Sequence, residues 1–115
     1  MKMRLLLIFL VITSLVITAQ RVDADDSRVN AVQIRFEMHR FDPASIQIRA
    51  GVPTVLTVVN AGKERIEFES FKLRREKVVE PGQTIVIRLP ALPAGSYDFF
   101  DDFHGDVPEG EIVAK

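Results

Sequence analysis

The sequence contains no cysteine among its 115 residues. A chain without cysteine forms no disulfide bond and offers no thiolate to a soft metal ion. Core packing, alone or together with a bound metal ion, must therefore hold a small domain of this kind together. Any metal site would be built mainly from oxygen and nitrogen ligands.

Catalytic motifs are also scarce. The chain has only two histidines, so a Ser-His-Asp arrangement has little support. Four serines follow the N-terminal segment, and none lies in a nucleophile-elbow pattern: Ser27, Ser45, Ser70 and Ser96. No glycine-rich phosphate loop is present. We expect that the protein is not a hydrolase and assign no catalytic residue.

The N-terminus has the pattern of a secretory signal. Lys2 and Arg4 precede an apolar run over residues 5–19, which is short for a spanning helix and lies close to the N-terminus. Small residues at positions −3 and −1 predict cleavage after Ala24, with Ala19 as the alternative. Residues 1–24 are thus the predicted signal peptide and residues 25–115 one domain. An uncleaved N-terminal anchor is the other interpretation, and both predict export.

A large excess of basic charge is missing as well. The chain has 15 basic and 16 acidic residues, and three basic and one acidic residue precede the predicted cut, so the 91-residue mature chain carries a formal charge of −3. This charge argues against nucleic acid as a partner. The length suits one small domain with a single core, and no repeat or linker interrupts it.

Sustained helical spacing is absent, and the apolar residues follow the period of strands. Residues 52–59 are more continuously apolar, as expected of a central strand covered on both faces. Turn signals, such as Asn60-Ala61-Gly62 and Pro81-Gly82, separate the runs. The pattern predicts an all-β sandwich of seven to eight strands, with strands near residues 32–38, 46–49, 52–59, 66–71, 84–89, 97–100 and 111–114.

Three local features of this pattern are interpreted separately. Met38 continues the apolar alternation of its strand, which predicts a core position, whereas His39 falls on the polar side. Residues 71–79 combine apolar and charged side chains without a clear period, and residues 71–77 could form a short helical turn. Phe99, Phe100 and Phe103 are expected to fill the core and shield the following loop.

Several segments together resemble the cupredoxin-like superfamily. Residues 41–51 (FDPASIQIRAG) match its F-x-P-x-x-I-x-V-x-A-G opening, and Val58-Val59-Asn60 matches its L-x-V-x-N strand end. Residues 95–113 resemble the metal loop of plastocyanin-like proteins, in which a cysteine, a histidine and a methionine follow one another. The resemblance implies a Greek-key β-sandwich.

More specific segments narrow the resemblance. Residues 67–70 (EFES), 73–79 (LRREKVV) and 99–104 (FFDDFH) are similar to the small periplasmic cupredoxin-like proteins that accompany bacterial ferrous-iron permeases, and to the cupredoxin domain of related iron-uptake lipoproteins. The resemblance implies a periplasmic metal-binding protein of iron uptake. Its partners would be a periplasmic iron-binding protein and a membrane iron permease.

The chain departs from the copper-binding pattern at the ligands themselves. Asp101 stands where the cysteine ligand would be, Glu109 stands near the methionine, and the first histidine ligand falls near Arg65. Without the thiolate, blue-copper electron transfer is not expected. His104 matches the histidine of the plastocyanin-like loop, so the loop presents hard oxygen ligands around one imidazole.

Five residues are the candidate metal ligands. Glu67 and Glu69 lie two residues apart on a predicted strand, so their carboxylates point to the same face. Asp101, Asp102 and His104 belong to the loop, and strand alternation would put Asp102 and His104 on one side and Asp101 on the other. All three can bind one metal ion only if the loop leaves strand geometry. The simpler interpretations are a solvated sheet face and a polar turn.

Oxygen ligands with one imidazole suit iron, manganese or Cu(II), and anionic oxygens favour Fe(III) over Fe(II). The leading hypothesis is a metal-binding protein, for an iron or copper ion, that assists ferrous-iron oxidation or transfers iron to a permease. The alternatives are a metal-free docking subunit of a membrane complex and a periplasmic copper-handling protein. A basic stretch could be a solvated edge, a docking patch, or a partner for Glu67 or Glu69: Lys72, Arg74, Arg75 and Lys77.

Overall fold

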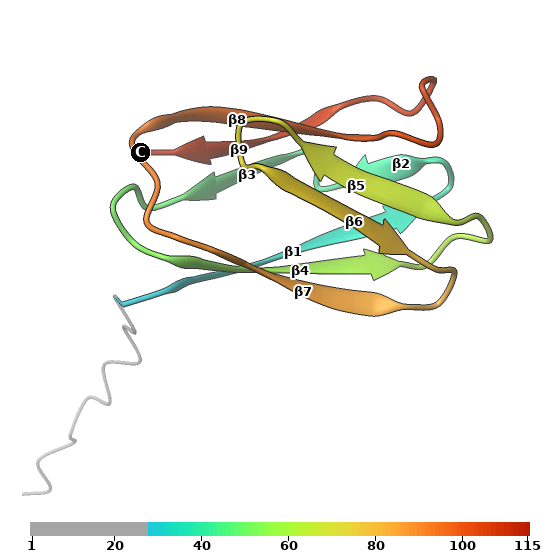
Figure 1. Ribbon diagram of the computed structural model, residues 1–115, viewed down its shortest axis with the longest axis horizontal. Coiled ribbons are helices and arrows are strands. Elements are labelled where there is room, and N and C mark those ends of the chain that lie inside the picture. Colours follow the sequence, from blue (N-terminus) through green and yellow to red (C-terminus); the bar gives the residue numbers. More distant parts are fainter. Residues whose placement is uncertain (1–27) are drawn as a thin grey trace, which may run out of the picture.

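The computed structural model describes residues 28–115, so the predicted signal peptide lies outside the described residues. Two sheets face each other, with strand orders β2-β1-β4-β7 and β3-β9-β8-β5-β6 (Figure 1). Residues 28–115 contain no helix long and apolar enough to cross a membrane. The nine strands of this part of the chain are β1 (Asn30–Glu37), β2 (Arg40–Asp42), β3 (Ser45–Ile48), β4 (Thr54–Asn60), β5 (Ile66–Ser70), β6 (Arg75–Val79), β7 (Thr84–Leu89), β8 (Gly95–Asp101) and β9 (Gly110–Ala114).

The predicted all-β sandwich is confirmed. Two of the nine strands, β2 and β6, lie outside the seven predicted strand ranges. The three-residue β2 pairs with the end of β1, and β6 follows a turn over residues 71–74. Both sheets are mixed, because β1 pairs with β4 and β3 pairs with β9 in parallel. In the second sheet β5 lies between β6 and β8, with Phe68 opposite Asp101. The sheet thus brings the EFES segment next to the strand that leads into the metal-loop segment.

The core lies between the two sheets and follows the predicted alternation. In β1, Ile34 and Phe36 are buried, while Arg35 between them and Glu37 after them are exposed. β4 differs from the prediction, because only one of its faces is fully buried and Val55, Thr57 and Val59 on the other face stay half-buried. A central strand of a two-layer sandwich is covered on one face by the other sheet and on its other face only by neighbouring side chains.

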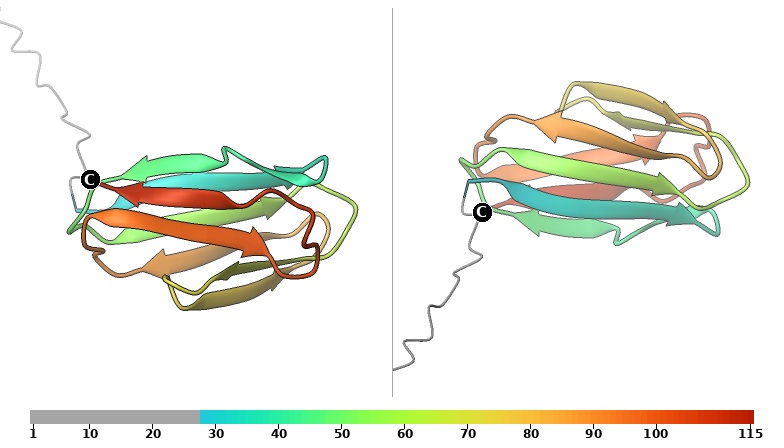
Figure 2. Two further views of the ribbon diagram at one scale, coloured as in Figure 1. Left: turned by 90° about the horizontal axis from the view of Figure 1, so that it is seen from above. Right: turned by 90° about the horizontal axis from the view of Figure 1, so that it is seen from below.

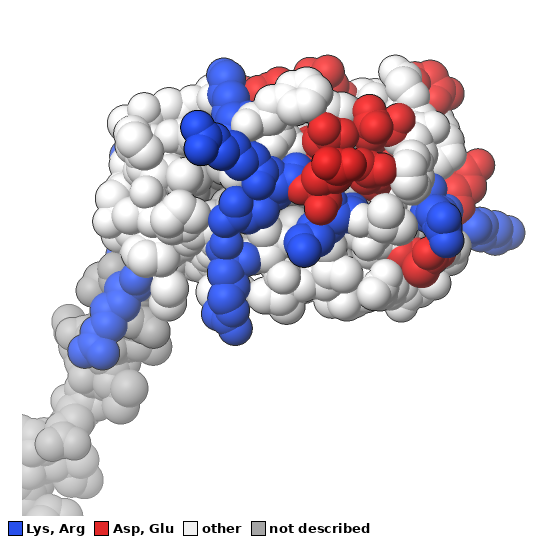
Figure 3. Space-filling model, viewed as in Figure 1, with Lys and Arg blue, Asp and Glu red and all other residues white. Residues whose placement is uncertain are grey.

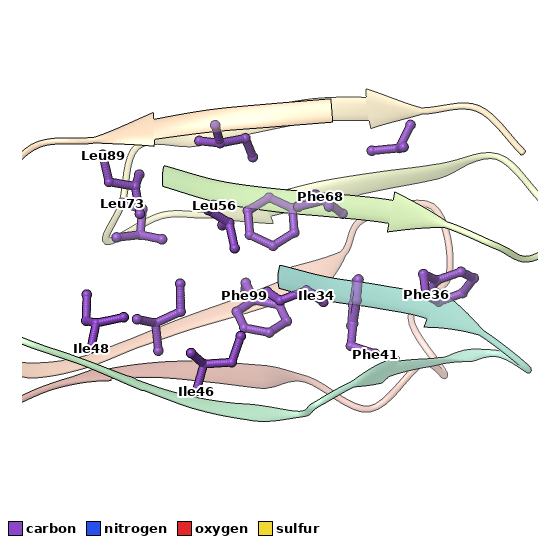
Figure 4. Packing of buried hydrophobic residues seen from close by; sticks show 14 of the residues in the cluster. Ile34, Phe36, Phe41, Ile46, Ile48, Leu56, Phe68, Leu73, Leu89 and Phe99 are labelled. Atoms are coloured by element: carbon purple, nitrogen blue, oxygen red, sulfur yellow. The ribbon is translucent and has the colours of Figure 1, made fainter. Parts of the chain in front are cut away.

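Four phenylalanines form the centre of this core (Figure 4). Phe41 contacts Phe36 and Phe99 edge-on, with ring centroids 5.3 and 5.2 Å apart, and Phe68 stacks on Phe99 at 5.2 Å. Such pairs add to the free energy gained by burying the rings themselves. The other two phenylalanines of the loop segment differ from the prediction, since Phe100 is half-buried and Phe103 is 44% exposed.

The start of β9 depends on the absence of a side chain at Gly110. A Cβ atom there would overlap the ring of Phe99 and would lie 2.8 Å from the carbonyl oxygen of Ala44. We therefore expect Gly110→Ala to lower the free energy of unfolding by about 1 to 3 kcal/mol, because neither the packed ring nor the backbone can move away freely. Chemical denaturation measures the loss. Gly105→Ala is the matched control, since open space surrounds that position.

The hairpin between β1 and β2 overturns the core prediction for Met38. Glu37 pairs with Arg40, so Met38 and His39 form a two-residue turn with φ values of 51° and 59°. Positive φ at both central positions is typical of the turns that match strand twist. Met38 is consequently 75% exposed. The same turn places His39 at the end of the sandwich where the β4–β5 and β8–β9 loops also lie (Figures 1 and 2).

Candidate metal centre

Carboxylates gather on the outer face of the second sheet. Because Phe68 points into the core, Glu67 and Glu69 both point outward from β5, as predicted. Glu69 lies opposite Glu76 of β6, and oxygen atoms of Glu67, Glu69 and Glu76 lie within 4.8 Å of one another. Asp102 adjoins them, since its N–H donates to the carbonyl oxygen of Glu67 at 3.0 Å. These four residues are called the carboxylate cluster below.

Glu67 is the buried member of this cluster. Its exposed fraction is only 6%, and its Oε1 atom has no hydrogen-bond partner within the part of the chain that the structure describes. Buried carboxylate oxygens are costly unless they are hydrogen-bonded, ion-paired or bound to a metal. The side chain is therefore not a solvated surface glutamate, and it leaves one oxygen available to a ligand.

The pKa values of two members of the cluster are raised. The pKa of Glu67 is raised to about 7, first by a side-chain hydrogen bond with Glu76, then by burial and by the negative charges of Glu76, Asp102 and Glu69. Burial, followed by the charges of Asp102 and Glu76, also raises the pKa of Glu69. Glu67 therefore releases its proton only as pH rises through about 7, and a bound cation could take the place of that proton.

The basic stretch does not neutralise the cluster. Lys72 lies 3.9 Å from Asp98 and donates to the carbonyl oxygen of Ser96, while the Arg75 guanidinium donates to three backbone carbonyls. Among residues 28–115, no ion pair joins Glu67, Glu69 or Glu76 to a lysine or arginine. Acidic side chains gather on this face, and basic side chains lie beside them (Figure 3).

Asp101 lies on the opposite side of the chain from Asp102 and is buried, with 2% exposure. Its Oδ1 accepts the N–H groups of Glu67 and Phe103, both at 3.0 Å. Its Oδ2 lies 2.6 Å from Nδ1 of His104. Asp101 therefore ties the loop after β8 to β5 and holds the imidazole of His104.

The second group of ionisable side chains lies at the end of the sandwich. Nε2 of His104 lies 3.3 Å from Oε2 of Glu64, and His39 lies 3.7 Å from the same oxygen through Nδ1. Nε2 of His39 lies 2.8 Å from Oδ2 of Asp106. These four residues, together with Asp101, are called the imidazole cluster: His39, Glu64, Asp101, His104 and Asp106.

Charges within the imidazole cluster shift two pKa values. The hydrogen bond with Asp101 raises the pKa of His104, helped by the charges of Asp101, Glu64 and Asp106 and opposed by burial. The hydrogen bond from His39 lowers the pKa of Asp106. Both shifts reflect imidazoles placed against carboxylates.

Asn60 positions the loop that carries Glu64. Its fully buried amide donates to the carbonyl oxygens of Glu64 and Val79, at 2.7 and 2.9 Å, and its Oδ1 accepts the N–H of Gly62 at 3.0 Å. Each polar atom of this side chain thus has a partner, as buried amides require. The asparagine at the end of β4 therefore orders the approach to β5.

The predicted ligands thus fall into two neighbouring groups. The structure brings Glu67, Glu69 and Asp102 together on the sheet face, while Asp101 and His104 belong to the imidazole cluster. Sequence reasoning missed Glu76 and Glu64. In the structure, a hairpin that turns over residues 71–74 pairs Glu76 with Glu69. The sequence did not predict this hairpin, because the side chains of residues 71–79 show no clear period. No signal in the sequence linked Glu64 to the two histidines.

Comparison with known proteins identifies the fold family. A family model described as a cupredoxin-like domain matches residues 6–114. The chain belongs to this cupredoxin-like family. It is 34% identical over 109 residues to an uncharacterized protein of Rickettsia prowazekii (strain Madrid E). The matched region covers 95% of this chain and 87% of that protein.

Solved cupredoxin-like structures resemble this one. The metal-binding domain of the Cu(I)-exporting P-type ATPase CopA of Streptococcus pneumoniae, solved with Cu(I), has a TM-score of 0.68 and 19% identity, covering 76% of this chain and 87% of that chain. Auracyanin A, a blue copper protein of Chloroflexus aurantiacus, has a TM-score of 0.62 and 11% identity, and the match covers 76% of this chain and 99% of that chain. At these identities the likeness shows the fold alone. The cupredoxin-like chain itself has no cysteine to offer copper.

Proposed function

We propose that this cupredoxin-like protein binds iron at the carboxylate cluster and serves iron uptake in the bacterial periplasm. The observation that carries the proposal is the buried Glu67 carboxylate, which has an unpartnered oxygen and lies against Glu69 and Glu76. Carboxylates of like charge stay together at low cost only if a proton or a cation lies between them. A cation bound there would satisfy Oε1 of Glu67 and remove the repulsion.

The ligand chemistry favours iron over a soft metal ion. All members of the cluster supply carboxylate oxygens, which suit hard cations such as Fe(III) and Mn(II) and disfavour Cu(I). Anionic oxygens also stabilise the higher charge of Fe(III) relative to Fe(II). Iron is the cargo in this account: it arrives as Fe(II), loses one electron to an oxidant such as dioxygen or Cu(II), and stays bound as Fe(III).

The exposure of the cluster suits transfer. Glu67 is buried, Glu69 is half-buried, and Glu76 and Asp102 are exposed, so a bound cation would be reachable from one side of the sheet. A partner could therefore take iron from Glu76 and Asp102 without unfolding the domain. The resemblance of the EFES and FFDDFH segments to proteins of ferrous-iron permease systems supports a periplasmic iron-binding protein and a membrane permease as those partners.

Metal titration of the purified protein tests the proposal. Isothermal calorimetry with Fe(II) under anaerobic conditions, and with Fe(III) and Mn(II), should show one site. Glu67→Gln should weaken iron binding by at least about tenfold, because even the loss of a residue that orients a metal ligand costs about 10- to 100-fold in affinity. Glu69→Gln should weaken binding in the same direction.

Glu111→Gln is the matched control. Glu111 is exposed on β9 of the same sheet, where its oxygens accept hydrogen bonds from Ser45 and Ser96, so its replacement removes one negative charge outside the cluster. Iron affinity should be unchanged in this variant. If neither glutamate variant of the cluster differs from Glu111→Gln, or if the native protein binds no iron, the metal-free docking role replaces the proposal.

A further inference from the structure

The outer face of the second sheet changes in charge along the direction of β5. The carboxylate cluster lies beside the strand itself, where the outward positions are glutamates. At the end of the strand the ring of Phe71 contacts that of Phe100 from β8, with centroids 5.2 Å apart. Beyond this aromatic pair, the turn over residues 71–74 carries Lys72 and Arg74. The face therefore passes from acidic, through aromatic, to basic, and Figure 3 shows the acidic and basic side chains next to each other.

The aromatic part of this face is exposed to solvent. Among residues 28–115 Phe71 is the most exposed phenylalanine, at 73%, and Phe100 beside it is half-buried. Val78, which lies opposite Glu67 in the register of β5 with β6, is 43% exposed. Aromatic side chains are enriched in protein–protein interfaces, where their truncation often costs the most affinity. The aromatic pair, the basic turn and the carboxylate cluster are together called the docking face: Phe71, Phe100, Lys72, Arg74, Glu67, Glu69, Glu76 and Asp102.

The basic end of the docking face is not neutralised within its own chain. Among the described residues Arg74 forms no ion pair, and Nζ of Lys72 lies 3.9 Å from Asp98. Arg74 also has a φ of 55°, a conformation that glycine adopts at lower cost, so the turn itself does not require an arginine. A hollow of about 210 Å³ opens beside Arg74 and the carboxylates of Glu69 and Glu76. Both charge and space are therefore available to an incoming surface.

We propose that a second copy of this chain docks on this face in the metal-free protein, about a two-fold axis that passes beside the Phe71–Phe100 pair. A two-fold interface uses the same patch of both copies, so every contact occurs twice. The order acidic, aromatic, basic then puts the turn of each copy against the carboxylate cluster of the other, and the aromatic pairs against each other. Lys72 and Arg74 of each copy supply the cations that the cluster of the other copy lacks.

Charge complementarity favours a second copy over an unrelated partner. A uniformly acidic surface would meet the carboxylate cluster and a uniformly basic one would meet the turn, and like charges brought together are unfavourable at an interface. A copy of the docking face satisfies both ends at once. The face covers part of one sheet, so we expect a small interface and a reversible dimer. The basic turn of the second copy then occupies the cluster until another cation displaces it.

Sedimentation velocity of the purified protein, in a chelator and at low salt, tests the interface. The mass should rise from one chain to two as the protein concentration increases, and added salt should weaken the dimer. Phe71→Ser and Arg74→Glu should each weaken dimerisation by at least about tenfold, because each removes a contact that occurs twice. Val86→Ser and Lys63→Glu are the matched controls. Both side chains are exposed outside the docking face, on β7 and in the β4–β5 loop, so their replacement should leave the dimer unchanged.

Mixing two charge variants tests the two-fold arrangement itself. Arg74→Glu makes the basic end of the docking face acidic, whereas Glu76→Arg adds basic charge at the acidic end. Each variant alone should dimerise at least about tenfold more weakly than the native chain, because like charges meet at both ends. An equal mixture of the two should form a tighter mixed dimer, in which opposite charges meet again. A mixture no tighter than either variant alone would overturn the arrangement.

An iron titration adds a readout that rests on the proposed function. Fe(II), added under anaerobic conditions without the chelator, should dissociate the native dimer, because the ion and the basic turn compete for the same carboxylates. A dimer that binds iron without weakening overturns the inference. So does a native chain that stays monomeric in the chelator at every concentration, or a dimer that Phe71→Ser and Arg74→Glu leave intact. A chain that dimerises as described but binds no iron contradicts the iron site alone, so the two proposals fail independently.

Discussion

Replacing Asp101 with alanine is expected to lower the free energy of unfolding by about 3 to 5 kcal/mol. The side chain accepts two backbone N–H groups, from Glu67 and Phe103, and the Nδ1–H of His104. It is buried, so water does not readily replace the lost acceptor. Each buried donor left without a partner costs about 1 to 3 kcal/mol. Equilibrium denaturation in urea measures the change.

The neighbouring Asp102 provides the control for this variant. It is exposed and belongs to a group of like charges, so Asp102→Ala removes repulsion without removing a buried acceptor. Its stability should change by less than about 0.5 kcal/mol. Equal effects of the two alanine variants would contradict the role assigned to Asp101, which is to hold the metal-loop segment against β5.

Glu67→Gln is expected to flatten the pH dependence of stability in the metal-free protein. The pKa of Glu67 is about 7 in the folded protein and 4.5 is its ordinary value. Between these values the folded chain retains a proton that the unfolded chain has released, so the free energy of unfolding falls as pH rises. The contribution is fully present below about pH 4.5 and is lost as pH rises through about 7.

Thermal melts from pH 4 to 8 in the presence of a chelator measure this dependence. His104, whose pKa is raised from 6.5, also loses its stabilising contribution as pH rises through its folded value. The difference between native and Glu67→Gln protein isolates the glutamate. The native melting temperature should fall more steeply than that of the variant between about pH 4.5 and 7. Parallel curves would mean that the Glu67 carboxylate is not held in the environment described.

Strand periodicity was sufficient to predict the sandwich and the paired carboxylates. A period of two places Glu67 and Glu69 on one face whatever the neighbouring strands are, and the structure agrees. Glu76 joins them only through the register of β5 with β6. That register depends on the turn over residues 71–74, whose mixed side chains do not specify a turn type. Such a cross-strand partner follows from tertiary pairing and not from local pattern.

The loop after β8 shows where alternation stops being informative. Alternation would group Asp102 with His104, but β8 ends at Asp101 and the chain turns there, so His104 returns to Asp101. In the same way, Met38 continues an apolar alternation yet occupies a turn with positive φ. Both differences occur where a strand ends within an apparently regular pattern, because turn geometry reverses the direction of the following side chain.

The most direct test of the account is the position of iron itself. Crystals of the protein soaked with an iron salt, with diffraction recorded on both sides of the iron absorption edge, would locate the ion by anomalous scattering. We expect one strong peak in contact with the carboxylates of Glu67, Glu69 and Glu76. A peak beside His104 without one at these glutamates, or no ordered iron in the protein, would contradict the assignment of the carboxylate cluster as the iron site.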